Sequence, residues 1–248
     1  MIDDIRCPTL EDRLRCRERP SRKPAMHHAW RSLLFLHWRV EAKRVQRTLP
    51  PGLFVDSHDG AAYVGVVPFF MRDIRPRGLP AVPGLSNFLE LNMRTYVFDA
   101  EGRPGVWFYS LDCNSRLTVW GAKKFFHLPY RGARMSATTG DDGAIHYRSQ
   151  VGDRYQTQLT YRLGLAEKPA EAGSLEFFLV ERYLLFSAAR DGRLFTGQVV
   201  HAPYPLVDVS LNAWSSNLFT RHDWNVDESQ PDHVCASRGV EVDVFWLN

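Results

Sequence analysis

Polar side chains that could move a proton or bind an anion occur at alternate positions in the segment NFLELNMRTYVF, residues 87–98. Alternate residues of an extended strand share one face, so Glu90, Asn92 and Arg94 project together, opposite the leucines and methionine between them. Such a row is most often the solvent-facing side of a sheet. The competing interpretation is a polar barrel interior, in which Glu90 exchanges a proton and Arg94 or Arg131 binds a carboxylate through its planar guanidinium.

The adjacent pair Lys123 and Lys124 offers a different chemistry. A lysine beside a second cation in an apolar pocket loses its proton more easily and can form a Schiff base with a carbonyl substrate. Neighbouring residues of a helix point about 100° apart, however. The pair is therefore also typical of the surface of an amphipathic helix.

Histidines supply further candidates. His37 and His201 could contribute to the same pocket, although each also suits a structural role in a core. The donors in His27-His28 and in residues 56–59 lie too close in sequence to converge on one ion, so we expect no metal site. Dinucleotide, P-loop, nucleophile-elbow and zincin motifs are missing from the sequence, and we expect no cofactor.

Short strands must position these residues. Apolar and alternating patterns bounded by turn residues predict strands over 32–40, 61–70, 87–98, 104–112, 144–150, 154–163, 183–189, 194–201 and 239–247. Helical patterns cover 41–48, 113–126 and 174–182, with Ser174 as a cap, and residues 72–86 are expected to form a long loop. Many short strands around a few short helices predict a mainly β, closed barrel or cone.

Composition limits the class of protein. The chain has 248 residues, 44% of them hydrophobic, and its net charge of +3 is a small difference between 31 basic and 28 acidic residues, so nothing demands nucleic acid. We expect a single domain over 26–248, preceded by a basic, solvated arm over 1–25 that is frayed or packed on the surface. No apolar run is long enough for a membrane helix, so no membrane partner is expected. Four scattered cysteines fit a reducing cytosol.

Several ordered segments resemble a known family. They are HAWRSLLFLHW at 28–38, LPPGL at 49–53, DGAAYVGVVP at 59–68, IRPR at 74–77, LELNMRTYV at 89–97 and VHAPYPL at 200–206. Together they look like the YqjF-like family of uncharacterised bacterial proteins, over about residues 26–248. That family is similar to the acetoacetate decarboxylases, and the resemblance implies a closed β-barrel or cone with a small-molecule pocket inside it.

The resemblance also assigns site residues. The decarboxylases carry a Tyr-x-Glu strand, matched here by Phe88-Leu89-Glu90, and a later Pro-Lys-Lys segment, matched by Pro129-Tyr130-Arg131. In this register the acid is retained, but the Schiff-base lysine becomes Tyr130 and its cationic neighbour becomes Arg131. An alternative register would recruit Lys123 or Lys124 and abandon the proline anchor.

These assignments predict a lyase, hydratase or isomerase that acts on a small oxo acid without a Schiff-base lysine. Glu90, Tyr130 and Arg131 would be catalytic, and the substrate would be bound by Arg94, Asn92, His37 and His201. The alternative is a non-catalytic protein that binds a small metabolite, and a third hypothesis is an interaction domain whose aromatic loops face another protein. The decarboxylase relatives form oligomers, which implies a homo-oligomer.

Overall fold

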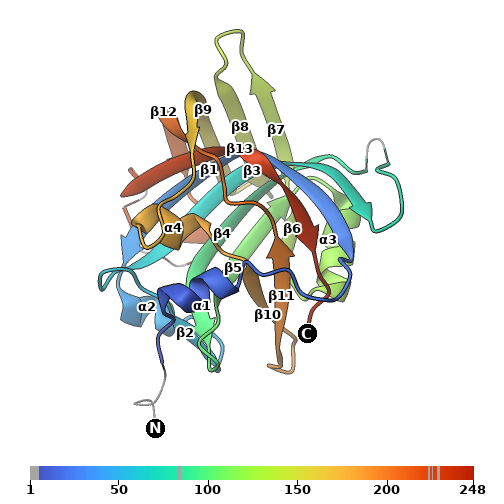
Figure 1. The fold of residues 1–248 in the computed structure, drawn as a ribbon. Coiled ribbons are helices and arrows are strands. Elements are labelled where there is room, and N and C mark those ends of the chain that lie inside the picture. Colours follow the sequence, from blue (N-terminus) through green and yellow to red (C-terminus); the bar gives the residue numbers. More distant parts are fainter. Residues whose placement is uncertain (1–5, 83–84, 223, 225, 228–229) are drawn as a thin grey trace.

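A computed structural model describes residues 6–82, 85–222, 224, 226–227 and 230–248 of the chain, and Figure 1 shows them as one large curved sheet with short helices at its edges. The strands are β1 (Met26–Val40), β2 (Leu53–Val55), β3 (Ala62–Pro76), β4 (Phe88–Asp99), β5 (Pro104–Cys113), β6 (Tyr130–Gly132), β7 (Arg134–Thr139), β8 (Ile145–Val151), β9 (Tyr155–Lys168), β10 (Leu184–Ala188), β11 (Leu194–Val200), β12 (Leu206–Ser216) and β13 (His233–Val244). The helices are α1 (Leu10–Arg15), α2 (Ala42–Gln46), α3 (Arg116–Phe125) and α4 (Leu175–Val180), with one 3-10 turn at Thr220–His222.

Seven of the strands close into a barrel, in the order β1-β3-β4-β5-β10-β11-β13, and the pairing of β1 with β13 completes the ring. That last pairing is long and antiparallel and runs from Met26 opposite Val244 to His37 opposite His233. β10 joins β5 in parallel, whereas its other neighbour, β11, is antiparallel. The mainly β, closed barrel expected from the sequence is confirmed.

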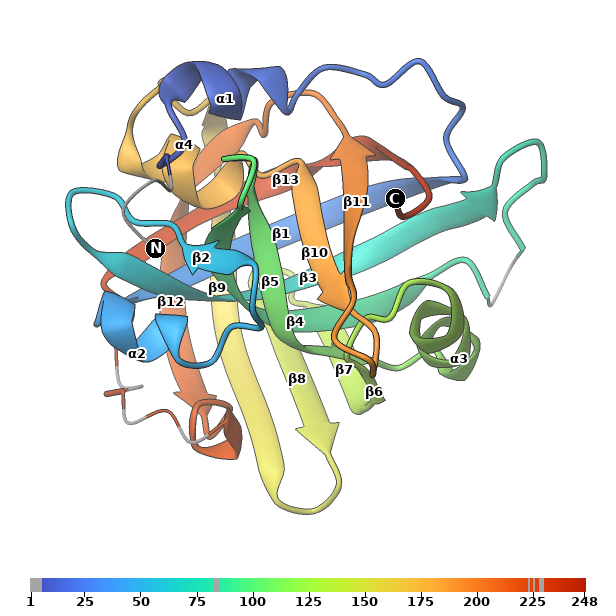
Figure 2. The same ribbon diagram turned by 90° about the horizontal axis from the view of Figure 1, so that it is seen from below.

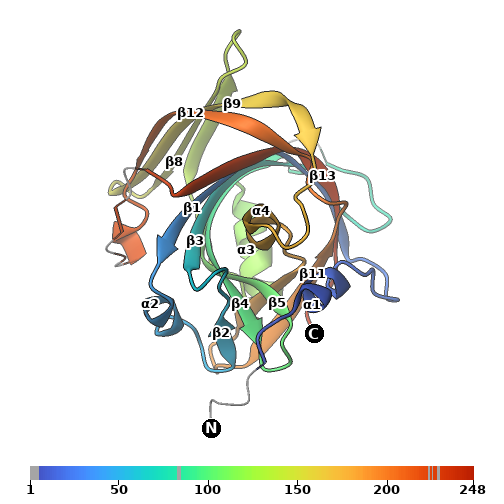
Figure 3. The ribbon, with the colours of Figure 1, turned by 60° about the vertical axis from the view of Figure 1, so that its left-hand side comes forward.

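A second layer lies outside the ring. From β13 the sheet continues through β12, β9 and β8 to β7, and Figure 3 shows these strands folded over the outer side of β1 and β3. The space between the two layers is filled by an apolar cluster that includes Leu34, Val64, Leu91, Met93 and Tyr147. The outward side chains of β4 are therefore buried as well as the inward ones.

This second layer decides which way the polar row of β4 faces. Every residue from Phe88 to Asp99 is buried, with Leu89, Leu91 and Met93 packed against the second layer. Glu90, Asn92 and Arg94 consequently project into the barrel. The solvent-facing interpretation of the row is wrong, because both faces of this strand are covered by protein.

The two ends of the barrel differ. α4 enters one end, and its last four residues are all buried. Ser174 caps this helix, because its Oγ accepts a hydrogen bond from the amide of Phe177 at 3.2 Å. α3 covers the other end with an amphipathic surface and no fully buried residue. Figure 2 shows α3 and α4 on opposite sides of the barrel. No helix within the described part of the chain is long and apolar enough to cross a bilayer.

The N-terminal segment is packed on the barrel over its described residues, 6–25. Thr9 and Asp12 form a capping box for α1, and Arg13 forms a bidentate ion pair with Asp56 at 2.6 and 2.8 Å. Arg19 pairs with Asp243 farther along. Four arginines of this segment thus contact the barrel, whereas Arg6 and Arg15 pair with acidic residues of the segment itself and remain mostly exposed.

Sequence patterns missed some elements. β6, β7, β12 and α1 were not expected, and β3 extends to Pro76, so the loop expected over 72–86 is shorter. β3 reaches that far because its end pairs with the start of β1, where Met26 lies opposite Pro76. This is a long-range pairing that a local pattern does not contain.

Candidate functional site

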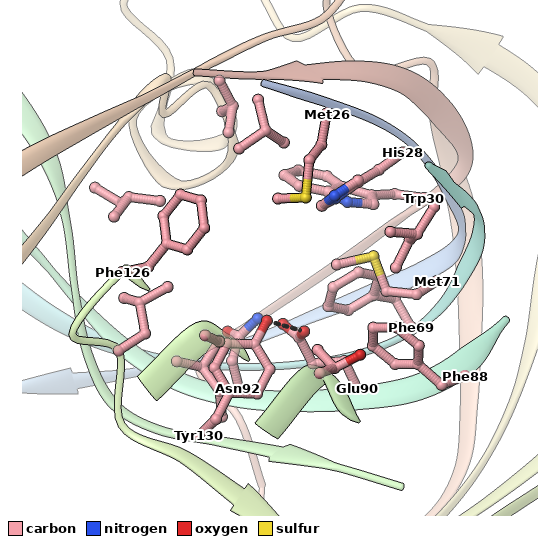
Figure 4. Close-up of a pocket in the computed structure, with 18 of the residues that line it drawn as sticks. Met26, His28, Trp30, Phe69, Met71, Phe88, Glu90, Asn92, Phe126 and Tyr130 are labelled. Atoms are coloured by element: carbon pink, nitrogen blue, oxygen red, sulfur yellow. Dashed lines mark hydrogen bonds between the residues drawn. The ribbon is translucent and has the colours of Figure 1, made fainter. Parts of the chain in front are cut away.

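A cavity of about 670 Å³ occupies the barrel between α3 and α4. This volume lies within the range of ordinary small-molecule sites. Most of its lining is apolar and much of that is aromatic, as Figure 4 shows for Trp30, Phe69, Phe88 and Phe126. The polar groups on the wall are few, and Glu90, Asn92 and Tyr130 gather on one side of it.

Glu90 and Tyr130 form the chemical centre of this wall. The Tyr130 hydroxyl donates a hydrogen bond of 2.6 Å to Oε2 of Glu90. Tyr130 begins β6, which pairs with β5 in parallel and places Tyr130 beside Leu111. Tyr147 fixes the backbone of Glu90 from the outer layer, since its hydroxyl donates to the Glu90 carbonyl oxygen at 2.8 Å.

Burial sets the protonation of both groups. It raises the pKa of Glu90 to about 7; hydrogen bonds from Tyr130 and Asn92 oppose this rise, and the charge of Asp112 adds to it. Burial and the neighbouring Glu90 raise the pKa of Tyr130 well above its ordinary value. Near neutral pH the carboxyl group can therefore accept or donate a proton, while the phenol stays protonated as a donor.

Farther along β4, the cavity meets α4. Arg94 donates from Nη2 to the carbonyl oxygen of Leu179 at 3.2 Å, and Arg182, just beyond the helix, donates from Nε to the carbonyl oxygen of Phe178 at 2.6 Å. Both arginines line the cavity and both are buried. The cavity thus runs from an acid–base pair on β4 to a cationic end at α4.

Three sequence-predicted site residues lie outside the cavity lining. Arg131 sits opposite Asp112 in the β5–β6 pairing, on the other face from Tyr130, and Asp112 is itself held by Arg221 at 2.9 Å through both carboxylate oxygens. His37 is buried with its Nδ1 3.2 Å from Nδ1 of His233. His201 is stacked on Tyr183, with ring centroids 4.6 Å apart. The structure brings together Glu90, Asn92, Arg94 and Tyr130, and leaves these three apart.

No lysine reaches the cavity. The chain has five, and Lys23, Lys43, Lys123, Lys124 and Lys168 are all described and all absent from the lining. Lys123 and Lys124 are exposed on α3, whose cavity side is formed instead by Leu117, Gly121, Ala122 and Phe125. Tyr130, rather than a lysine, is thus the residue that contacts Glu90.

Sequence reasoning missed several polar cavity residues, among them His28, Trp30 and Arg182. His28 and Trp30 share a face of β1, and in Figure 4 they stand across the cavity from Glu90. Burial lowers the pKa of His28 to about 4, and neither of its ring nitrogens has a partner among the described residues. The alternate spacing of His28 and Trp30 in the HAW segment could have indicated that both face the cavity. Arg182 follows a helix, and no sequence pattern indicated that it lines the cavity.

Among the described residues no three His, Cys, Asp or Glu side chains form a group able to hold a metal.

This closed barrel with helices at both ends has the acetoacetate decarboxylase-like fold. The acetoacetate decarboxylase of Legionella pneumophila matches with 13% identity over 91% of this chain and 87% of that one, at a TM-score of 0.64. An acetoacetate decarboxylase-like enzyme from Sphingomonas wittichii RW1 matches with 12% identity over 92% and 93%, at 0.60. The enduracididine biosynthesis enzyme MppR, complexed with the condensation product of pyruvate and imidazole 4-carboxaldehyde, matches with 16% identity over 90% and 87%, at 0.59.

Sequence comparison defines the family within this fold. Residues 27–241 match DUF2071, described as an uncharacterized conserved protein. The uncharacterized protein YqjF of Bacillus subtilis is 34% identical over 223 residues, which cover 89% of this chain and 90% of YqjF. The chain belongs to the DUF2071 family, and the resemblance seen in its sequence is confirmed.

Proposed function

We propose that this protein is an acid–base enzyme that acts on a carbonyl-containing acid without a Schiff base. The observation that carries the proposal is the 2.6 Å hydrogen bond between Tyr130 and Glu90 inside an apolar cavity. A carboxyl group with a pKa of about 7 is matched to proton transfer at neutral pH. The structural neighbours include enzymes, among them MppR complexed with a product derived from pyruvate, which supports an oxo acid as the class of substrate.

The shared step of lyase, hydratase and isomerase chemistry on such a substrate is enolisation. The Glu90 carboxylate removes a proton from the carbon next to the carbonyl, and the electron pair moves onto the carbonyl oxygen. The Tyr130 hydroxyl turns to that oxygen and donates a hydrogen bond to the developing enolate. Return of the proton to another carbon completes an isomerisation, and loss of a leaving group completes an elimination. In this proposal Asn92 positions Glu90 through a hydrogen bond, and Arg94 binds the carboxylate of the substrate.

A non-catalytic binding protein is the second candidate. It is favoured by one observation, the mostly apolar lining around a small number of polar groups. Both candidates use the same cavity, so they are separated by turnover rather than by binding. The cavity itself favours both over an interaction domain.

The test is proton exchange in D₂O, followed by NMR, at the carbon adjacent to the carbonyl in a panel of oxo acids. We expect one or more members to exchange faster with the protein than without it, and we expect Glu90→Gln to abolish this catalysed exchange. Glu171→Gln changes an exposed carboxylate and is the matched control. Catalysed exchange that persists in Glu90→Gln refutes the role of Glu90, and a lack of exchange across the panel supports the binding protein.

We also propose a cytosolic location and a homo-oligomer. The location is supported by four cysteines that are all free thiols. The oligomer is supported by apolar side chains that remain exposed around the α3 end of the cavity, including Leu79, Leu117, Trp120 and Trp246. Sedimentation of the purified protein tests the oligomer directly.

A further inference from the structure

The cavity holds a buried cation that has no carboxylate partner. Arg94 is 8% exposed, and none of the ion pairs within the described part of the chain includes it. Its contacts include the Leu179 carbonyl and the faces of Phe35 and Tyr96, at 5.5 and 5.6 Å from the ring centroids, and its Nε has no hydrogen-bond partner among the described residues. An unpaired buried charge is costly, so a cavity wall of this kind favours an anionic occupant.

A second guanidinium lies at the same place. Arg182 stands over the ring of Tyr96 at 5.1 Å, so both arginines flank one aromatic side chain. Arg182 does have a carboxylate, Asp56, with Nη1 to Oδ2 at 2.7 Å, but Arg13 occupies both oxygens of that carboxylate as well. Arg13 and Arg182 thus share the single negative charge of Asp56. In addition, Nη2 of Arg182 has no partner among the described residues.

The cationic end is well separated from the acid–base pair. Glu90 and Arg94 are four residues apart on β4, which places their Cα atoms about 13 Å apart along an extended strand. Arg94 leans farther away, toward Tyr96 and α4. A small oxo acid has its carbonyl and carboxylate carbons adjacent or separated by one further carbon, so it cannot contact Glu90 and Arg94 at the same time. The wall between and around them is largely apolar, with Leu33, Val67, Val106, Phe108 and Val199 among its residues.

We infer that the cavity binds an amphipathic anion: a carboxylate held by Arg94 and Arg182, joined by an apolar chain or ring system to a carbonyl group at Glu90 and Tyr130. This inference rests on the proposed function for the carbonyl end, and it identifies the substrate class of that site. The carboxylate end depends only on the two arginines and the apolar wall. An experiment can therefore contradict the role of the carbonyl end without contradicting the role of the carboxylate end, and the reverse.

The experiment measures binding by isothermal titration calorimetry at pH 7.5, with decanoate, 1-decanol and butanoate as probes. We expect decanoate to bind about tenfold or more tightly than decanol, because only decanoate forms charge-assisted hydrogen bonds with the arginines. Butanoate should bind at least about a hundredfold more weakly than decanoate, because its shorter chain removes less apolar surface from water. Arg94→Gln should erase the preference for decanoate, and Arg94→Lys should keep part of it.

Controls make each outcome decisive. Arg116→Gln, an exposed change on α3, should bind all three probes like the parent protein, and circular dichroism checks the fold of every variant. Glu90→Gln should bind decanoate normally while it loses catalysed exchange, which separates this inference from the proposed function. Equal binding of decanoate and decanol, a folded Arg94→Gln variant with unchanged preference, butanoate as tight as decanoate, or no binding of decanoate to the folded parent would each overturn the inference.

Discussion

The hydroxyl of Tyr130 and the carboxyl group of Glu90 lie 2.6 Å apart although the two residues are 40 positions apart in the sequence. This contact lowers the pKa of Glu90 against the larger upward effect of burial. Each residue therefore sets the protonation of the other, and the pair rather than either member is the functional unit.

Removal of the Tyr130 hydroxyl should change both the pH profile and the rate of catalysed exchange. In the parent protein the rate should rise with pH through about 7, as Glu90 ionises. In Tyr130→Phe we expect the midpoint to move to higher pH and the plateau to fall about a hundredfold, as for the loss of one oxyanion donor. Tyr161→Phe removes a buried hydroxyl that donates to Ser32 outside the cavity and should leave the midpoint unchanged. An unmoved midpoint in Tyr130→Phe would contradict the coupling.

Glu90 should also make stability depend on pH. Its pKa in the folded protein is raised from 4.5 to about 7, so the folded state binds the proton more tightly and loses stability as pH rises through that window. The whole effect is about 3 kcal/mol between pH 4 and pH 8. The Glu90→Gln variant should lack this pH dependence. Urea titrations should therefore show its free energy of unfolding rising relative to that of the parent protein as pH rises. A constant difference between the two proteins would show that Glu90 is not perturbed.

Borohydride reduction in the presence of oxo acids should leave no substrate-dependent adduct on the protein. All five lysines lie outside the cavity lining, so none can meet a carbonyl at Glu90. Intact-mass spectrometry with peptide mapping checks this. An adduct on Lys123 or Lys124 would contradict this prediction and favour the sequence register that uses one of these lysines for Schiff-base chemistry. It would also require α3 to turn its exposed side toward the cavity.

The ion pair between Asp112 and Arg221 should be a strong determinant of stability. Both side chains are almost fully buried, at 3% and 2% exposed, and bonded in a bidentate way at 2.9 Å. Asp112→Asn leaves a buried cation without its partner and should cost about 3–5 kcal/mol of unfolding free energy. The same substitution at Asp153, which pairs with Arg134 in solvent, should leave stability unchanged in the same denaturant titration. A mild effect at Asp112 would mean that water reaches the pair.

The sequence was informative about which residues share a face and uninformative about what covers that face. Alternation alone placed Glu90, Asn92 and Arg94 together, but the layer that turns the row inward is built by β7, β8, β9 and β12, which come later in the chain. Arg131 illustrates the opposite case. It follows Tyr130 directly on an extended segment, so the two could not both face one cavity, and the alternation rule already contained that answer. Arg182 could not have been found, because its position depends on how α4 enters the barrel.

The contact between Arg13 and Asp56 links the periphery of the molecule to its interior. α1 buries no side chain completely, and the span that matches the family starts at residue 27, after the segment that carries Arg13. Release of that segment would return the whole Asp56 carboxylate to Arg182 and reduce the positive potential at the inner end of the cavity. Loss of Arg13 alone would therefore weaken the hold of this end of the cavity on an anion, although Arg13 itself lies outside the cavity lining.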